Sequence, residues 1–286
     1  MLVTMLTDRV VASAGSAMWG VAGLDLPAYL GRIGDSGELA PTFETLRRLH
    51  RQHVATFCFE NLDAVLGRPI RLDLPSVADK LVRRRRGGYC HEQNLLFAAV
   101  LECLGLPVRR LLARVVAPDG SPRPRAHSCL VVDVDGQSWL ADVGFGCEGL
   151  LEPIALASTA RARQGDWQYR VRSTRDGWLL ETVAGRGWIG LYSFTVADFL
   201  PPDFEMASYF LSTHPHSPFS RQVIVQRGTG EVRHALRGDE LTVSRPDGTV
   251  QTRRLAHGEF AALLEDVFGL QLANDELERL WRAARG

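Results

Sequence analysis

The spacing of hydrophobic residues changes near residue 107, from a helical period to a strand-like alternation. Before that point apolar residues recur every three or four positions, as at Leu96, Val100 and Leu104, which places them on one face of a helix. Residues 24–85 follow the same period, with more polar positions in between. The first part of the chain is therefore predicted to be helical.

Short strands separated by turn residues are predicted after residue 108. Apolar runs flank Asp135–Gly136, a dipeptide typical of tight hairpin turns, and a second hairpin is predicted over 168–183. Such a succession favours a small antiparallel barrel or sheet. From residue 201 onward the pattern predicts one helix, a series of strands and two amphipathic helices at the end.

These patterns divide the chain into four parts. Residues 24–107 are expected to form a helical domain, residues 108–200 a β-barrel domain, and residues 201–286 a domain that mixes helices and strands. Residues 1–23 lack a sustained apolar segment and are interpreted as a poorly ordered extension rather than a signal peptide, with Met18 as a candidate for the true start.

Composition narrows the range of partners. Lys plus Arg and Asp plus Glu both number 33, so the formal net charge is zero. Proteins that bind nucleic acid or anionic membranes usually carry a basic surplus, so neither partner is expected. No stretch approaches the ~18–20 apolar residues of a membrane span. The five cysteines show no CxxC spacing, which favours free thiols and a cytoplasmic location.

Two local features favour structural roles over functional ones. His50 and His53 lie three positions apart on a predicted helix, but no third ligand is near, so surface or capping roles are favoured and no metal is expected. The run Arg83–Arg86 is interpreted as a solvated helix end rather than an anion site.

Cys90 is the first candidate for chemistry. It follows Gly87 and Gly88 and comes before the apolar helix that Gly105 and Pro107 are expected to end. A thiol at a helix start meets the partial positive charge of free N–H groups, which favours the thiolate. Cys90 is therefore a candidate nucleophile. On this stretch alone, a small buried hydrophobic residue remains the alternative.

The turn at 135–136 predicts which residues of the hairpin face each other. With a two-residue loop, 134 pairs with 137 and paired positions sum to 271, so Asp142 faces Cys129. His127 lies on the same strand face and becomes a diagonal neighbour of Asp142, ~7–8 Å away at Cα. A carboxylate beside an imidazole fixes its tautomer. If this hairpin packs on the start of the Cys90 helix, the three residues form a Cys–His–Asp triad.

The segment RGGYCHEQN resembles the signature of the arylamine N-acetyltransferases. The segments AHSCLVV around His127 and DVGFG from Asp142 to Gly146 resemble the second and third triad segments of this family, in the same order. FENLD, STHPHSPF and VIVQR are also similar to family segments. Six residues of the first segment match the signature: Arg86, Gly87, Gly88, Cys90, Glu92 and Asn94.

The resemblance implies an α+β fold and a reaction. The fold would combine an N-terminal helical bundle carrying Cys90, an antiparallel β-barrel carrying His127 and Asp142, and a C-terminal α/β lid, around a core like that of cysteine proteases. Acetyl-CoA would be a co-substrate rather than a tightly bound cofactor. The acetyl group would pass through a thioester on Cys90 to an arylamine or arylhydrazine.

One loop is expected to contact these substrates. Gly144 and Gly146 around Phe145 would let the backbone approach the CoA arm or the acceptor ring, although the two glycines could equally serve only to turn the chain. By analogy with the family, Thr213 is expected to contact CoA.

Departures from the family pattern keep alternatives open. Cys58 replaces a usual proline, His91 replaces a common aromatic residue, and Cys147 and Glu148 follow DVGFG where glycine and a threonine–proline stretch are expected. The last departure keeps open an amide synthase that closes a macrolactam on a polyketide. A transglutaminase-like or papain-like hydrolase and a catalytically silent binding module are further alternatives.

Overall fold

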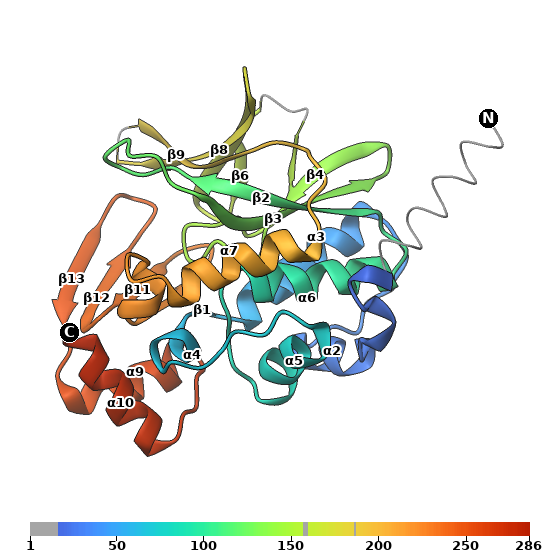
Figure 1. Cartoon of the computed structure of the whole chain (residues 1–286). Coiled ribbons are helices and arrows are strands. Elements are labelled where there is room, and N and C mark those ends of the chain that lie inside the picture. Colours follow the sequence, from blue (N-terminus) through green and yellow to red (C-terminus); the bar gives the residue numbers. More distant parts are fainter. Residues whose placement is uncertain (1–16, 157–159, 186) are drawn as a thin grey trace.

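A computed structural model describes residues 17–156, 160–185 and 187–286 of the chain. Figure 1 shows helices packed beneath a large sheet, with a smaller sheet at one side next to the two C-terminal helices. This mixture of helices and antiparallel sheets confirms the predicted α+β class. Among the described residues, no helix combines the length and the apolar character needed to cross a bilayer.

The helical part is organised around one buried helix, α6 (Cys90–Cys103). Its residues 90–101 are all buried, and Phe97 and Leu101 share a core with Leu46 of a neighbouring helix. The elements that precede α6 are the 3-10 turn η1 (Val21–Gly23), α2 (Leu26–Ile33), α3 (Phe43–Thr56), α4 (Leu62–Val65), α5 (Leu74–Ala78) and the π-helical turn η2 (Asp79–Arg83).

Ser76 does not cap α5 (Leu74–Ala78), and neither Asn274 nor Asp275 caps the last helix. Ser76 lies inside α5, because the Asp73 carboxylate accepts a hydrogen bond from Ser76 N at 3.0 Å and caps the helix from further upstream. Helix α10 (Asn274–Ala284) likewise begins after Ala273, whose N–H donates to Glu276 at 3.2 Å, so neither Asn274 nor Asp275 is its cap.

The large sheet is antiparallel, in the order β5-β4-β3-β2-β9-β8-β7-β6. Edge strand β5 also contacts β7, so the sheet is nearly closed on itself. The β3–β4 hairpin has the predicted register, since Val134 pairs with Gln137 and the ladder continues to Leu130 and Ala141. The strands are β2 (Val108–Val115), β3 (Arg125–Val134), β4 (Gln137–Ala141), β5 (Ile154–Ala155), β6 (Ala162–Gln164), β7 (Trp167–Thr174), β8 (Gly177–Ala184) and β9 (Gly187–Phe194).

The small sheet joins the helical part to the C-terminal part of the chain. Its order is β1-β10-β11-β12-β13, so a short strand from the helical part pairs with a strand more than 160 residues later, Phe59 with Gln226. Helix α9 (His257–Asp266) and α10 pack on it through Phe260 and Trp281. The strands are β1 (Phe59–Glu60), β10 (Ile224–Gly228), β11 (Arg233–Arg237), β12 (Glu240–Ser244) and β13 (Val250–Arg254).

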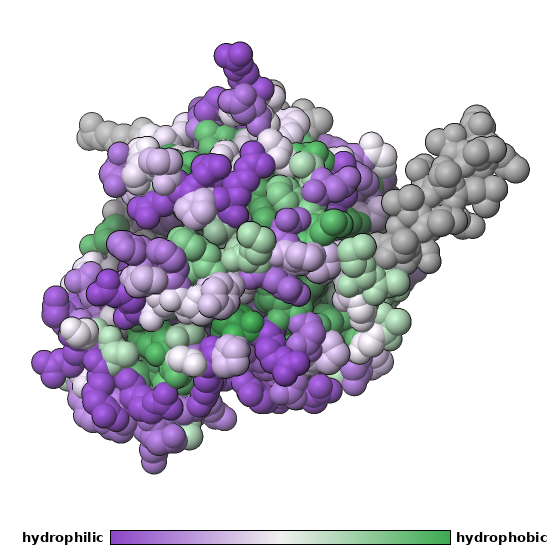
Figure 2. All heavy atoms as spheres, in the orientation of Figure 1, coloured by the Kyte–Doolittle hydropathy of each residue, from purple (hydrophilic) through white to green (hydrophobic). Residues whose placement is uncertain are grey.

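Helix α7 (Pro201–Thr213) crosses the middle of the molecule in front of α6 and leads into the short α8 (Pro218–Arg221) (Figure 1). Its Phe204 and Ala207 pack on Leu112 and Ala126 of the large sheet. Figure 2 shows hydrophobic atoms gathered beside this helix, whereas hydrophilic atoms cover the lower edge of the same face.

The predicted N-terminal extension falls into two parts. Residues 1–16 lie outside the described residues. Residues 17–23 pack on the body of the protein: the ring of Trp19 lies 5.3 Å from that of Phe204, and the Arg110 guanidinium lies 4.5 Å above Trp19.

The arginine run does not form a uniform solvated helix end. Residues 83–85 are exposed, but Arg86 is buried and its Nη2 lies 3.0 Å from Glu60 Oε1. Lys80 is buried nearby, between Asp63 Oδ2 at 3.0 Å and Glu92 Oε1 at 2.8 Å. The expectation is wrong for Arg86, because the chain turns inward there and the buried carboxylates supply its partners.

We expect Glu60→Gln to lower the free energy of unfolding by about 3–5 kcal/mol, because the Arg86 guanidinium would stay buried without its main counter-charge. Urea denaturation measures this loss. Glu44→Gln is the control: it removes an exposed carboxylate 3.0 Å from Arg47, and it should leave the denaturation midpoint almost unchanged. Similar shifts in the two variants would contradict a special role for the buried pair.

Candidate active site

The first turn of α6 holds Cys90 at the positive end of a buried helix. Cys90 is the first helical residue and only 4% of its surface is exposed. Just ahead of it, Tyr89 N donates to Glu92 Oε2 at 3.1 Å, and Lys80 holds the other oxygen of this carboxylate. The Glu92 carboxylate thus joins the backbone at the start of the helix to Lys80 of η2.

The segment before the helix packs so closely on β1 that position 87 must be glycine. A Cβ atom there would lie 2.3 Å from the Cys58 carbonyl oxygen, so only glycine lets this segment run beside β1. The bridge between Phe59 and Gly88 continues the contact. Two segments far apart in the sequence of the helical part thereby set the position of Cys90.

The hairpin brings His127 and Asp142 together as predicted. His127 lies on β3, Asp142 follows β4, and His127 Nε2 lies 2.7 Å from Asp142 Oδ2. The strand ladder ends one residue earlier, at Ala141, so Asp142 does not pair with Cys129 but turns toward α6. There Asn94 Nδ2 donates to Asp142 Oδ1 at 2.9 Å.

Cys90 completes the cluster from the other side of the imidazole. Its Sγ lies 3.9 Å from the carbonyl oxygen of Ala126, the residue before His127, and Cys90 is close enough to help raise the pKa of the His127 ring. Since Nε2 is occupied by Asp142, Nδ1 is the nitrogen left for the thiol. A thiol, an imidazole and a carboxylate are therefore neighbours, which is the set of groups that moves a proton off a nucleophile.

His127 and Asp142 each stabilise the charged form of the other. Burial works against a charged His127 ring, but the attraction and hydrogen bond of Asp142 and the bond with Cys90 outweigh it and raise the pKa of His127 to about 10. Burial also works against ionised Asp142, yet His127, Asn94 and the N–H of Gly144 lower the pKa of this carboxyl. The structure thus favours an imidazolium–carboxylate pair at neutral pH.

Aromatic rings form the wall around this cluster. The Phe145 ring lies edge-on to His127 with centroids 5.0 Å apart, and the Tyr192 ring lies 4.7 Å from His127. Phe59 packs beside Cys90 and lies 5.9 Å from Phe219. A flat apolar ligand would find suitable surroundings here.

The glycines of the predicted binding loop are explained by packing within the protein. A Cβ at Gly144 would lie 2.7 Å from Cys90 Cα. At Gly146, where φ is 95°, a Cβ would lie 2.1 Å from Gln226 Oε1. Phe145 between them contacts His127, as a substrate-binding residue would need to. Thr213 is exposed at the end of α7, where its hydroxyl donates to the Tyr209 carbonyl at 2.6 Å.

His50 and His53 are buried, so the expectation of surface or capping roles is wrong. His50 Nδ1 lies 3.2 Å from the Leu151 oxygen, and Asp142 N donates to His50 Nε2 at 3.2 Å. Burial, stronger than the opposing hydrogen bonds, lowers the pKa of His50 to about 4, so the ring is neutral. His50 therefore joins both ends of the loop that carries Phe145.

The spacing of residues along α3 indicates that both histidines are buried. Leu46, Leu49, His50 and His53 follow the spacing i, i+3, i+4, i+7 of a single helix face, so the histidines share the apolar side of α3. Their three-residue separation could suit a metal, but the sequence favoured surface or capping roles over it. Within the described part of the chain, no three His, Cys, Asp or Glu side chains form a group that could hold a metal ion.

Of the other cysteines, Cys58, Cys129 and Cys147 are buried and Cys103 is exposed. Burial chiefly raises the pKa of Cys58 and of Cys147 to about 12, so these thiols are poor nucleophiles. Cys103 is the last residue of α6 and is exposed.

We expect His127 to keep its charge through neutral pH, with ring deprotonation observed only near pH 10. Nitrogen-15 NMR of the histidine side chains measures this. Because the folded pKa exceeds the unfolded value of about 6.5, the pair's contribution to stability is complete below that pH and is lost as the pH rises toward 10. Asp142→Asn should move the transition to lower pH, and wild-type titration near 6.5 would refute the ion pair.

We expect His50→Leu to accelerate hydrogen exchange of the Asp142 amide by about tenfold, because its acceptor is removed. Exchange followed by NMR checks this. His53→Leu is the matched control, since His53 lies on the same helix as His50 and the change removes a buried hydrogen bond of 2.9 Å to Tyr29 of α2 without touching the loop. Equal acceleration in both variants would mean that His50 acts only through general stability.

Comparison with known proteins agrees with this geometry. A family model described as N-acetyltransferase matches residues 42–277. An arylamine N-acetyltransferase of Mycobacterium tuberculosis is 38% identical over 257 residues, which span 88% of this chain and 91% of the relative.

Solved structures agree as well. The arylamine N-acetyltransferase of Mycobacterium abscessus superposes with a TM-score of 0.90 at 39% identity, covering 95% of this chain and 99% of that one. The Mycobacterium marinum enzyme in complex with CoA gives a TM-score of 0.85 at 35% identity, covering 91% and 98%. The chain therefore belongs to the arylamine N-acetyltransferase family of acyltransferases.

Proposed function

We propose that this protein transfers an acetyl group from acetyl-CoA, through a thioester on Cys90, to the nitrogen of an arylamine or arylhydrazine. The observation that carries the proposal is the position of Cys90, at the first turn of α6 and beside the His127–Asp142 pair. A thiolate beside an imidazolium attacks a thioester carbonyl readily.

The reaction would take two half-steps on the same residues. In the first, Cys90 Sγ bonds to the acetyl carbon, the C–S bond to CoA breaks, and His127 protonates the departing CoA thiolate. In the second, the amine nitrogen attacks the acetyl carbon, His127 accepts the amine proton, and the Cys90 thiolate leaves. Asp142 would hold the imidazole in one orientation throughout both steps.

The surroundings of the cluster support an aromatic acceptor. Phe145 contacts His127, while Phe59 and Phe219 lie on the Cys90 side. The CoA in the M. marinum complex and the arylamine in the relatives' names support the donor and the acceptor. We place the CoA contacts at Gly144, Phe145, Gly146 and Thr213.

The alternatives are less well supported. The matching relatives are named arylamine N-acetyltransferases, which does not favour a carrier-dependent amide synthase or a cysteine hydrolase. A silent binding module would have no need for three such groups as neighbours. We place the enzyme in the cytoplasm, because all five cysteines are free.

Acetyl-CoA without an amine should release about one CoA per active site in a burst and leave one acetyl group on the Cys90 peptide, because donor and acceptor react in separate steps. Rapid-quench CoA release and peptide mass spectrometry measure this. Cys90→Ser should abolish the burst. Cys103→Ser should retain it, since Cys103 is an exposed thiol outside the site.

Each rival predicts a different result. A carrier-dependent synthase would give little burst from acetyl-CoA, and a hydrolase would turn over continuously without an amine. Acetylation of Cys103 in place of Cys90 would reveal non-specific chemistry. Acetyl transfer without acylation of Cys90 would overturn the mechanism while leaving the activity intact.

A further inference from the structure

The strand that carries His127 is irregular at the residue just before it. Position 125 of β3 pairs with position 114 of β2, but the next pair is 127 with 113. Ala126 is therefore an extra residue, and β3 has a β-bulge at this point. A bulge leaves its extra residue out of the ladder and bends the strand. The direction of the His127 side chain thus depends on what holds Ala126.

The other edge of β3 is open here as well. Within the described part of the chain, the ladder with β4 stops short of residues 126–129. Carbonyl groups two residues apart point to the same edge of a strand. The first turn of α6 takes the place of the missing strand, since Asn94 Nδ2 donates to the Ser128 oxygen at 2.8 Å and His91 Nε2 lies 3.0 Å from the Ala126 oxygen. The residue between these two bonds is the catalytic histidine.

The bond between His91 and Ala126 has a defined direction. Because a carbonyl only accepts, Nε2 of His91 carries the proton and donates it. Burial lowers the pKa of His91 to about 3, so the ring is neutral and Nδ1 carries no proton. Nδ1 is buried without a hydrogen-bond partner among the described residues. His91 therefore makes its one bond while leaving its other nitrogen unpaired, which costs stability.

Packing does not explain a histidine at this position. The His91 ring lies edge-on to the rings of Tyr89 and Phe204, with centroids 5.8 and 5.9 Å away. A phenylalanine ring would make the same contacts. The family pattern commonly has an aromatic residue here, and phenylalanine would avoid the unpaired Nδ1. The feature that histidine adds is the N–H group that Ala126 accepts.

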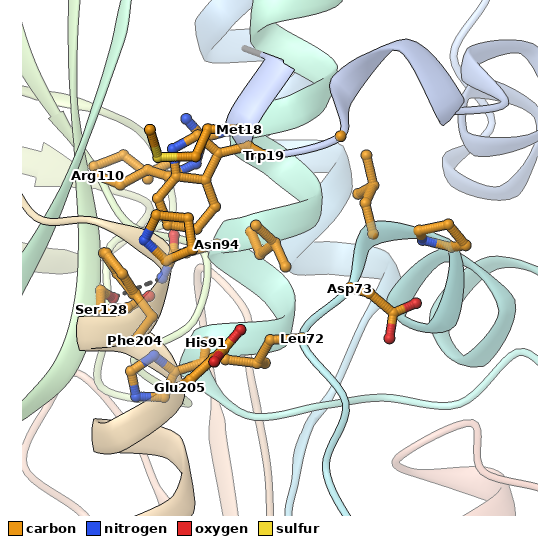
Figure 3. A pocket seen from close by; sticks show the side chains of 16 residues that line it. Met18, Trp19, Leu72, Asp73, His91, Asn94, Arg110, Ser128, Phe204 and Glu205 are labelled. Atoms are coloured by element: carbon orange, nitrogen blue, oxygen red, sulfur yellow. Dashed lines mark hydrogen bonds between the residues drawn. The ribbon is translucent and has the colours of Figure 1, made fainter. Parts of the chain in front are cut away.

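A cavity beside the first turn of α6 leaves room for this turn to move relative to β3. Its volume is about 260 Å³, and His91, Asn94, Ser128 and Phe204 are among the residues that line it. Figure 3 shows His91 beside Phe204, and the hydrogen bond that joins Asn94 to Ser128. Since close packing does not surround the turn on every side, hydrogen bonds fix its distance from β3.

The Ala126 carbonyl also lies beside the nucleophile. Its oxygen is 3.9 Å from Cys90 Sγ, so it is a second acceptor within reach of the thiol proton, besides His127. The bond from His91 to the same oxygen is much shorter, at 3.0 Å. Without His91, this buried carbonyl would lose its strong donor and would compete for the thiol proton.

We infer that His91 is a positioning residue for the acetyl transfer. Its Nε2–H holds the bulged Ala126 carbonyl against α6, so that the His127 imidazole faces the Cys90 thiol and receives the thiol proton in place of the carbonyl. His91 itself touches no reacting atom. The effect on acetylation rests on the proposed function, whereas the geometry can be tested without acetyl-CoA.

Nitrogen-15 NMR of the wild-type protein tests the hydrogen bond itself. We expect His91 to be the neutral tautomer that carries its proton on Nε2. A His91 ring protonated on Nδ1, alone or together with Nε2, at neutral pH would overturn the inference. This measurement needs no substitution.

Two variants separate the hydrogen bond from the ring. His91→Phe keeps the aromatic contacts but removes the donor, so the burst of CoA release should slow by about tenfold at unchanged amplitude. Its urea-denaturation midpoint should hardly change, because one unpaired buried acceptor, Nδ1, is exchanged for another, the Ala126 carbonyl. His91→Gln returns an N–H donor at a reach similar to that of Nε2 and should restore most of the rate.

Tyr29→Phe is the control for general stability. It removes a buried hydrogen bond of 2.9 Å to His53, away from β3, so it should lower the denaturation midpoint without slowing the burst. An equal loss of rate in Tyr29→Phe, an unchanged rate in His91→Phe, or no recovery in folded His91→Gln would each overturn the inference.

Alkylation of Cys90 by iodoacetamide makes the same comparison without acetyl-CoA. We expect alkylation of the Cys90 peptide, followed by mass spectrometry, to slow in His91→Phe, while labelling of the exposed Cys103 stays constant. Equal alkylation of Cys90 in wild type and His91→Phe would overturn the inference. Slowed alkylation in a protein whose wild type gives no CoA burst would refute the proposed function and still support the positioning by His91.

Discussion

Burial of a polar helical turn is the constraint on which this structure depends. Residues 91–94 follow Cys90 directly, and none is more than 2% exposed. Since water cannot reach them, each must find a partner inside the protein. His91 bonds to the carbonyl of Ala126 at the start of β3, and Glu92 bonds to Lys80 of η2. Gln93 donates to two backbone carbonyls near β1, and Asn94 donates to Asp142. The helical part, both sheets and the cysteine are thereby fixed to one another.

The same constraint makes a buried ion pair tolerable. Moving two charges out of water costs several kcal/mol per ion, and their attraction repays this only when the remaining lone pairs are also bonded. Asp142 meets that condition, since its carboxylate accepts from Asn94 and from Gly144 N as well as from His127. Its backbone N–H donates to His50. Desolvation is therefore outweighed, and the pKa of His127 rises.

The sequence predicted those features that depend on local rules. The turn at 135–136 set the register that brings His127 to Asp142, and helical spacing located α6. Features that depend on partners distant in the sequence were not predicted. Gly87 is needed because Cys58 lies against it, Arg86 is buried because Glu60 approaches it, and strand β1 exists only through its pairing with β10. The residue pattern of one segment does not indicate which distant segment packs against it, so residue spacing alone could not predict these contacts.

One polar atom of this turn stays unsatisfied where the turn meets the large sheet. Nε2 of His91 lies 3.0 Å from the Ala126 carbonyl oxygen, but Nδ1 of the same ring is buried without a hydrogen-bond partner among the described residues. An unpaired buried acceptor costs about 1–3 kcal/mol. The hydrogen bonds of Glu92, Gln93 and Asn94 hold the turn in place despite this cost, so the turn that positions the nucleophile is fixed without being fully satisfied.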